Sequence, residues 1–310
     1  MNPTVTIIMA TYNRAHFIVE TLHSIQNQIF TDWECLIVDD GGTDNTLEVI
    51  FPIIENDNRI KYFKRPATYQ KGLPGCRNYG LEVAKGNFII FFDDDDIVHP
   101  ENLKTCITIL EDDAVDFCHY QKLAYEGEKP PIEKCTITRQ QDLTKADIEK
   151  VITQEIGLAS CTVMWKKHCF KEIRFNESLL YAEEWECYSR LIAENFKGLM
   201  IDAVLYYNKK HPNSNTGEFY NNDPIRRASK KAAILLVVQN LKKKQLLSHA
   251  LLRYFVQLSL NFKEFNLFNH IMNTLQLPTF EKRKWQFFYK TLPLQLWFFG
   301  KWKKIKKGIK

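Results

Sequence analysis

Short apolar runs of β-forming residues alternate with helical periodicity through the first hundred residues of the chain. The runs at 4–10, 35–38, 60–63 and 87–92 predict strands, and the segments at 18–25, 43–54 and 76–84 predict helices. Strands that alternate with helices form parallel sheets that are covered by helices on both faces. We therefore predict an α/β fold with a mostly parallel central sheet.

Polar loops follow these strands at their carboxyl ends, where ligands bind in open parallel sheets. The loops are Thr11-Tyr12-Asn13, Asp39-Asp40 and Asp93-Asp94-Asp95-Asp96. Four adjacent carboxylates repel one another, so such a run belongs either on a solvated turn or beside a cation. Because the acidic run directly follows a core strand, we favour a bound cation over a solvated turn. Ligands that are all oxygen atoms favour Mg²⁺ or Mn²⁺.

The remaining sequence indicates an ordinary globular chain with a helical C-terminal part. A composition of 45% hydrophobic and 25% charged residues excludes disorder, and no apolar run is long enough for a spanning helix. Asn222-Asp223-Pro224 predicts a helix start, and residues 225–275 predict two or three helices. We divide the chain into an α/β domain at 1–222, a helical region at 223–281 and a basic aromatic tail at 282–310.

The cysteine spacing and the N-terminal residues indicate the cellular compartment of the protein. The eight cysteines form no Cys-x-x-Cys pair, so we expect reduced, mostly buried thiols. The first residues lack the basic segment and apolar stretch of a signal peptide, which predicts a cytoplasmic protein.

Four short segments resemble, in order, the signatures of family 2 glycosyltransferases of GT-A fold. They are Ile7–Arg14, Val38–Asp44, Gly75–Gly80 and Phe92–Asp96. The resemblance implies an inverting hexosyl- or N-acetylhexosaminyltransferase that moves a sugar from a UDP-sugar to an acceptor hydroxyl. The acceptor implied is a growing surface polysaccharide or a lipid-linked glycan.

The same resemblance assigns donor-site roles to individual residues. Tyr12 matches the aromatic ring that stacks on the base, and Asp40 matches the carboxylate that accepts the uracil N3–H. Packing of Tyr12 and helix capping by Asp40 are the alternatives. The full donor set that the resemblance implies is Ala10, Thr11, Tyr12, Asn13, Asp40, Arg77, Asn78, Asp93 and Asp94. For Arg77 and Asn78, a surface pair without substrate contact is an equally good interpretation.

Metal ligands are implied in the acidic run and near the end of the α/β domain. Alignment on the family places its Asp-x-Asp motif at Asp93-Asp94-Asp95, with Asp95 as the main ligand and Asp93 on the ribose or the metal. Asp96 is expected to support these ligands without direct contact. His211 resembles a late histidine of the family near the diphosphate, and we expect it to contact the metal or the diphosphate. The cofactor implied is Mn²⁺ or Mg²⁺.

A catalytic base is implied about ninety residues after the acidic run. The family has a Glu-Asp pair there, whereas this chain has Glu183-Glu184. Because the side chain of Glu is one methylene longer than that of Asp, either Glu184 or Glu183 can take the role, and we favour Glu184. An acidic helix start without catalytic function is the alternative.

The tail carries the net positive charge of the chain. Residues 282–310 hold ten of the 42 basic residues and no acidic residue, which leaves 32 basic against 37 acidic residues, or −5, in 1–281. Eight aromatic residues lie among these cations. Aromatic and basic residues together favour an anionic membrane surface, so we predict peripheral attachment to the inner face of the plasma membrane. Nucleic-acid binding is disfavoured, and packing of the tail on the helices is the alternative.

Two other functions use similar residues. A sugar nucleotidyltransferase is also α/β with an acidic metal site, but it needs a Gly-rich phosphate loop, and residues 4–20 contain no glycine. An inactive nucleotide-sugar-binding membrane scaffold is the second alternative. The presence of both the acidic run and the Glu183-Glu184 pair argues against it.

Overall fold

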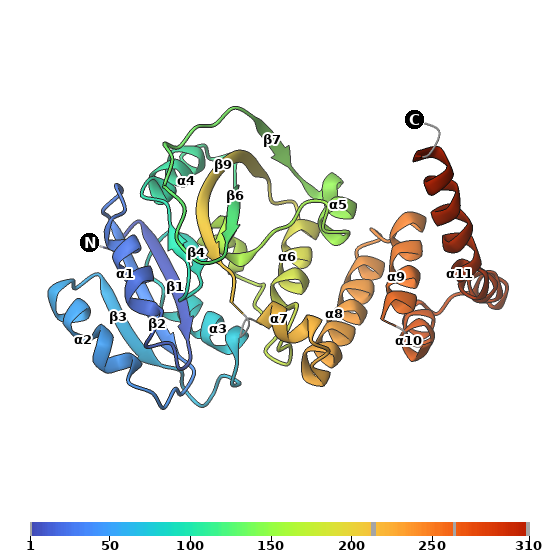
Figure 1. Cartoon of the computed structure of the whole chain (residues 1–310), viewed down its shortest axis with the longest axis horizontal. Coiled ribbons are helices and arrows are strands. Elements are labelled where there is room, and N and C mark those ends of the chain that lie inside the picture. Colours follow the sequence, from blue (N-terminus) through green and yellow to red (C-terminus); the bar gives the residue numbers. More distant parts are fainter. Residues whose placement is uncertain (1, 212–214, 263–264, 308–310) are drawn as a thin grey trace. The chain divides into compact units, whose positions relative to one another are not determined.

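The computed structural model describes residues 2–211, 215–262 and 265–307, which form two compact units, 1–233 and 234–310. Strands lie in the first unit (Figure 1). They are β1 Val5–Thr11, β2 Trp33–Asp39, β3 Ile60–Lys64, β4 Phe88–Phe92, β5 Ile97–Val98, β6 Phe117–Tyr125, β7 Gln140–Leu143, β8 Val163–Lys166 and β9 Gly198–Lys209.

Helices connect these strands. The helices of the first unit are α1 Ile18–Gln26, α2 Thr46–Asn56, α3 Leu73–Val83, α4 Asn102–Leu110, α5 Ile148–Ile152, α6 Glu183–Ala193 and α7 Asn215–Tyr220. Short 3₁₀ turns are η1 Lys145–Asp147, η2 Ser160–Thr162 and η3 Lys167–Phe170. The next helix, α8 Pro224–Lys243, begins in the first unit and ends in the second.

One sheet with the order β3-β2-β1-β4-β8-β6-β9-β5 organises the first unit, and β7 pairs with β9. The neighbours β3, β2, β1 and β4 are parallel, and β8, β5 and β7 add antiparallel pairs. Thr11 is opposite Asp39, and Met9 is opposite Phe92. The carboxyl ends of β1, β2 and β4 therefore lie at the same edge of the sheet.

Helices pack on both faces of the parallel half. Ile18 and Leu22 of α1 are fully buried in one cluster with Ile7 of β1. The next residue of β1, Ile8, points to the opposite face because side chains alternate along a strand. There α3 approaches so closely that a Cβ on Gly80 would lie 2.4 Å from the Ile8 side chain, so only glycine fits at position 80.

The second unit is helical. Its helices are the end of α8, α9 His249–Asn261, α10 Phe265–Leu275 and α11 Thr279–Lys307. Ser248 caps α9 by accepting a hydrogen bond from the Leu251 N–H at 3.1 Å. Trp285 of α11 is buried with its ring centre 4.9 Å from that of His249. The start of the predicted tail is therefore part of the core of this unit.

The architecture confirms the predicted α/β fold with a mostly parallel central sheet and C-terminal helices. All eight cysteines are free, and seven of them are buried. In the part of the chain that the structure describes, we find no helix with the length and hydropathy needed to cross a membrane.

Candidate active site

A cluster of polar groups surrounds Asp40 just beyond the ends of β1 and β2. Its carboxylate Oδ1 accepts hydrogen bonds from Arg65 Nε at 2.6 Å and from the Gly72 N–H at 3.0 Å. The backbone N–H of Asp40 donates to the Thr11 carbonyl at 2.9 Å, which links the two strand ends. Arg65 was not predicted, although a basic residue directly after a strand of this sheet is a usable signal.

Tyr12 lies at the same edge and exposes 44% of its surface. The ammonium group of Lys71 is 4.6 Å from the centre of its ring. An exposed ring at the same sheet edge as the partly exposed Asp40 carboxylate suits a planar base that carries an N–H. The proposed stacking by Tyr12 and hydrogen bonding by Asp40 stay predictions.

Asn13 and Arg14 organise the loop after β1, and Ala10 and Thr11 form the end of that strand. Asn13 has a φ of 55°, and its side-chain oxygen accepts from the Thr43 N–H at 2.7 Å. Arg14 lies 3.7 Å from Asp94 Oδ1 and 3.9 Å from Asp95 Oδ2. This arginine therefore joins the first polar loop to the acidic run.

Each carboxylate of the acidic run has a different environment. Asp95 Oδ2 is 2.8 Å from His211 Nε2, whereas Asp96 is fully buried and accepts from the Asn208 amide and the Lys209 N–H. Burial and then the Asp95 charge raise the pKa of Asp94 to about 7, and burial and then the Asp93 and Asp95 charges raise that of Asp96 to about 8. Asp93 is the most open, with 39% of its side chain exposed.

These residues fit a hard divalent ion. The buried Oδ2 of Asp94 accepts no hydrogen bond from any residue that the structure describes. Asp93 and Asp95 flank Asp94 in the sequence and offer further carboxylate oxygens, and His211 offers a ring nitrogen 2.8 Å from Asp95 Oδ2. Three carboxylates packed this closely repel one another unless they are protonated or neutralised by a cation. Of the residues that the sequence assigned to the metal, the structure thus brings Asp95 and His211 together, whereas Asp93 has a carboxylate oxygen within 4.8 Å of ligand atoms of Asp96 and Cys161.

Arg77 connects the acidic run to the start of α6. Its buried guanidinium donates to Glu183 Oε1 at 3.1 Å and to Ser160 Oγ at 2.8 Å, and it lies 3.7 Å from Asp93 Oδ1. Glu184 takes a different partner, because its Oε2 accepts from the Ser160 N–H at 2.9 Å. Burial raises the pKa of Glu183, although the Arg77 charge opposes this effect. Glu183 is thus buried and forms an ion pair with Arg77, whereas Glu184 is only half-buried.

Asn78 lies farther from this centre. Its amide nitrogen donates to the Phe175 carbonyl at 2.9 Å and to Glu177 at 2.8 Å, and its oxygen accepts from the Phe175 N–H at 3.0 Å. These bonds hold the segment before α6. An effect of Asn78 on the donor site would therefore be indirect.

The segment Ser160–Thr162 was missed by sequence reasoning. Ser160 bridges Arg77 and Glu184, and the sulfur of Cys161 lies within 4.8 Å of carboxylate oxygens of Asp93 and Asp96. Lys122 Nζ is 3.9 Å from the same sulfur. No motif marks these residues, since chain topology alone brings the turn to the end of β4.

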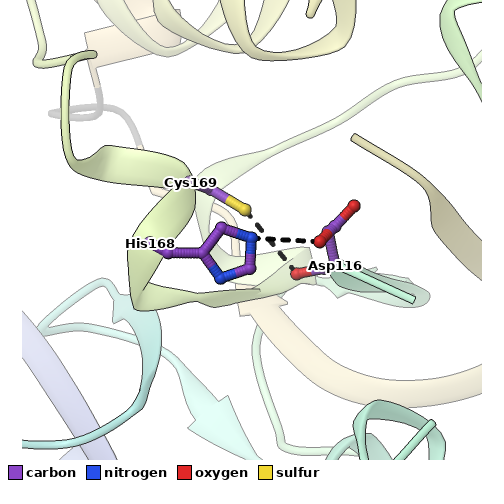
Figure 2. Close-up of side chains that lie close together, drawn as sticks. All are labelled: Asp116, His168 and Cys169. Atoms are coloured by element: carbon purple, nitrogen blue, oxygen red, sulfur yellow. Dashed lines mark hydrogen bonds and ion pairs between the residues drawn. The ribbon is translucent and has the colours of Figure 1, made fainter. Parts of the chain in front are cut away.

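A second cluster of ionisable groups lies at the start of β6 (Figure 2). His168 Nε2 is 3.0 Å from Asp116 Oδ1, and Cys169 Sγ donates to the Asp116 carbonyl at 3.8 Å. The other oxygen of Asp116 accepts from the Lys197 N–H at 2.8 Å. These contacts already satisfy the cluster and hold the loop before β9, so we assign it no chemical role.

Comparison with protein families identifies the chain. The family model for glycosyl transferase family 2 matches residues 6–173, which are more than half of the sequence. The chain belongs to glycosyl transferase family 2. It is therefore a glycosyltransferase, and the first-hundred-residue motifs lie within the matched region.

Two bacterial members of the family are similar in sequence. The GalNAc(5)-diNAcBac-PP-undecaprenol β-1,3-glucosyltransferase of Campylobacter jejuni is 30% identical over 203 residues, or 62% of this chain and 60% of that protein. The UDP-Glc:α-D-GlcNAc-diphosphoundecaprenol β-1,3-glucosyltransferase WfgD of Escherichia coli is 37% identical over 116 residues, or 37% of this chain and 44% of that protein. The similarity thus spans less than two thirds of either relative.

Solved structures show the same fold. S. aureus TarS 1–349 in complex with UDP superposes with a TM-score of 0.64 at 22% identity and covers 91% of this chain and 78% of its own. The Pyrobaculum calidifontis mannosyltransferase PcManGT, in complex with GDP-Man and Mn²⁺, gives 0.53 at 15% identity and covers 88% and 86%. This family 2 chain therefore has a GT-A-like fold followed by helices.

Proposed function

We propose that this family 2 enzyme transfers a sugar from a UDP-sugar to a hydroxyl of a lipid-linked glycan or surface polysaccharide, with inversion at the anomeric carbon. The observation that carries the proposal is the position of the acidic run Asp93–Asp96. Arg14 joins it to the first polar loop, and Arg77 joins it to the Glu183-Glu184 pair. A nucleotide diphosphate-sugar needs these three sites in that order: base, diphosphate and reacting carbon.

The donor nucleotide is assigned to the β1 and β2 ends. Asp40 is an acceptor in its ionised form, so it favours a base with an N–H, and the Tyr12 ring supplies a stacking face. Arg65 and the Gly72 N–H hold the Asp40 carboxylate in place. The UDP-glucose donor in the WfgD name and the UDP in the TarS complex support uridine as the nucleoside.

Asp95, with Asp93 and His211, is proposed to hold Mn²⁺ or Mg²⁺. A bound divalent ion supplies Lewis-acid stabilisation of the negative charge on the departing diphosphate. Arg14 lies within 4 Å of Asp94 and Asp95 and adds a fixed positive charge at the same place. Asp96 accepts hydrogen bonds from Asn208 and from the Lys209 N–H. These bonds hold the end of β9, which leads to His211, against the acidic run.

Glu184 is proposed as the base that takes the acceptor proton. The acceptor oxygen forms a bond to the anomeric carbon as the bond from that carbon to the diphosphate breaks and UDP leaves with the electron pair. The acceptor proton passes to the Glu184 carboxylate. Ser160 fixes one carboxylate oxygen of Glu184 and leaves the other, Oε1, for this purpose, whereas Glu183 stays paired with Arg77.

The C-terminal helix is proposed to attach the enzyme to the inner face of an anionic membrane. Phe280 and Phe287 lie seven residues apart on one side of α11 before Pro293, and Leu294 and Phe298 lie four apart after it. All four side chains are more than 60% exposed. Exposed apolar residues next to a lysine-rich end suit the boundary between headgroups and acyl chains. The side chains of Phe299, Trp302 and the lysines at 301–310 lie outside the described residues.

UDP release tests this function. The protein is incubated with a panel of UDP-sugars, Mn²⁺ and a synthetic N-acetylglucosaminyl diphosphate lipid, and the product is analysed by NMR for its anomeric configuration. Release of UDP with an inverted product is expected. Binding without release would favour an inactive scaffold, and formation of UDP-sugar from UTP and a sugar 1-phosphate would favour a nucleotidyltransferase.

A further inference from the structure

Three aromatic side chains from two separate segments form a small platform beside α6. Tyr181 precedes this helix, and Phe219 and Tyr220 end α7. The rings of Tyr181 and Phe219 stack with centres 4.4 Å apart and planes 10° apart. Tyr220 meets Phe219 edge to face at 5.5 Å and is 75% exposed. We call these three residues the aromatic platform.

Polar contacts from α8 hold the platform in place. Ser229 Oγ accepts from the Leu180 and Tyr181 N–H groups and donates to the Tyr181 carbonyl, each at 2.8–2.9 Å. Arg226 donates to the Leu180 carbonyl at 3.0 Å and pairs with Glu218 of α7 at 2.8 Å. The platform is therefore built from rigid elements and is not a loose surface group.

Tyr181 of the platform lies three residues before the proposed base, at the start of α6. Burial, then the Tyr220 hydroxyl and the Glu184 and Glu183 carboxylates, raise the pKa of Tyr181 to about 12. Lys230, one residue after Ser229, lies with Nζ 4.0 Å from the centre of the Trp185 ring. Tyr181 and Glu184 thus lie at the same end of α6, where the Lys230 ammonium packs on the Trp185 ring.

We propose that the aromatic platform is the acceptor subsite, where a pyranose ring stacks on the exposed Tyr220 ring and directs a hydroxyl toward Glu184. A pyranose ring has one face of C–H groups and a rim of hydroxyls. Such a ring packs its C–H face on aromatic carbon and keeps its rim in water or on charged groups. This inference rests on the proposed function, because it uses Glu184 as the base.

Other roles for the platform fit the structure less well. The base site assigned to the donor lies at Asp40 and Tyr12, at the ends of other strands, so a second base-stacking surface is not needed. A purely structural stack would bury its outer ring, whereas Tyr220 exposes three quarters of its surface. The exposed Tyr220 ring, held edge to face against Phe219, therefore offers its surface to a ligand.

Saturation-transfer NMR tests the proposal with defined probes. The full-length protein, with UDP and Mg²⁺, is mixed with methyl β-glycosides of glucose, galactose, N-acetylglucosamine and mannose at millimolar concentration. We expect saturation transfer to at least one glycoside. In Tyr220→Ala the signal falls about tenfold, the equivalent of ~1.4 kcal/mol. It is kept in Tyr220→Phe, which retains the ring.

Controls separate this subsite from the donor site. Phe51→Ala removes a half-exposed aromatic ring on α2, far along the chain, and is expected to leave the glycoside signals unchanged. The signals of UDP report the donor site in the same sample, so their loss would contradict the donor assignment alone. Absence of glycoside signals from the wild type, or equal signals in Tyr220→Ala, would overturn the acceptor subsite.

Discussion

His211 Nε2 lies 2.8 Å from Asp95 Oδ2, although the two residues are 116 positions apart in the chain. The antiparallel pairing of β5 with β9 brings them together, because Ile97 is opposite Tyr207. Asp96 reinforces this approach by binding Asn208 and the Lys209 N–H. The acidic run and the end of β9 therefore form one site.

Replacement of Asp95 tests the metal site. Asp95→Ala should abolish sugar transfer and leave the fold intact, since removal of one carboxylate from a crowded cluster relieves repulsion as it removes a ligand. UDP release and thermal unfolding measure the two effects. Asp113→Ala, which changes an exposed carboxylate on a turn, serves as the control. Full activity of Asp95→Ala, or of the wild type in excess EDTA, would contradict the assignment of Asp95 as a metal ligand.

The two glutamates should respond differently to the same change. Glu184→Gln keeps the shape but cannot accept a proton, so kcat should fall by roughly 10²-fold or more with little change in UDP affinity. Glu183→Gln removes the charge that faces the buried Arg77, so its main effect should be a lower Tm. Steady-state kinetics and calorimetry compare the two. If Glu183→Gln loses kcat at unchanged Tm while Glu184→Gln stays active, Glu183 is the base.

Metal stabilisation should grow with pH. Asp94 and Asp96 have pKa values of about 7 and about 8, both above the ordinary value of 3.8. A raised carboxyl pKa contributes stability below pH ~4 that is lost as pH rises through the folded pKa values. The metal-free protein should thus lose Tm between about pH 4 and pH 8, and Mn²⁺ should restore more of it at the upper end. Equal stabilisation by Mn²⁺ at both ends speaks against this account.

Asp40 should control uridine binding. Asp40→Ala removes a charged hydrogen-bond acceptor, and loss of such a bond weakens binding by about 1.5–3 kcal/mol, or roughly 10- to 100-fold in Kd. Calorimetric titration with UDP measures the change. Because Arg65 and Gly72 also bind this carboxylate, the Tm of the variant must be checked alongside. Unchanged UDP affinity in a folded Asp40→Ala protein would remove Asp40 from the donor site.

Membrane attachment is best tested by a short truncation. Deletion of the whole segment 282–310 would remove Trp285 and Leu292, which are buried in the helical unit. Deletion of 296–310 takes away six lysines and four aromatic residues and keeps those core contacts. The truncated protein should no longer sediment with vesicles rich in phosphatidylglycerol and should still release UDP. Equal sedimentation of both proteins would refute attachment through this end.

Sequence alone located the strands and helices that alternate around the acidic run, since their periodicity is strong. It placed the start of α2 at Thr43 instead of Thr46, because residues 43–45 form the turn that binds Asn13 and Ala15. It could not decide between Glu183 and Glu184, since that choice depends on Arg77, more than a hundred residues away. The roles of Ser160 and of the aromatic platform could also not be predicted from the sequence, because they arise from tertiary contacts and not from local motifs.

Calorimetric titration of UDP in the presence of Mn²⁺ and then in EDTA, with GDP and CDP as competitors, tests the central claim most directly. The account predicts tight binding of UDP with Mn²⁺, a loss of about tenfold or more in EDTA or in Asp95→Ala, and weaker binding of GDP and CDP. Binding of UDP that is indifferent to Mn²⁺, to EDTA and to Asp95 would contradict it.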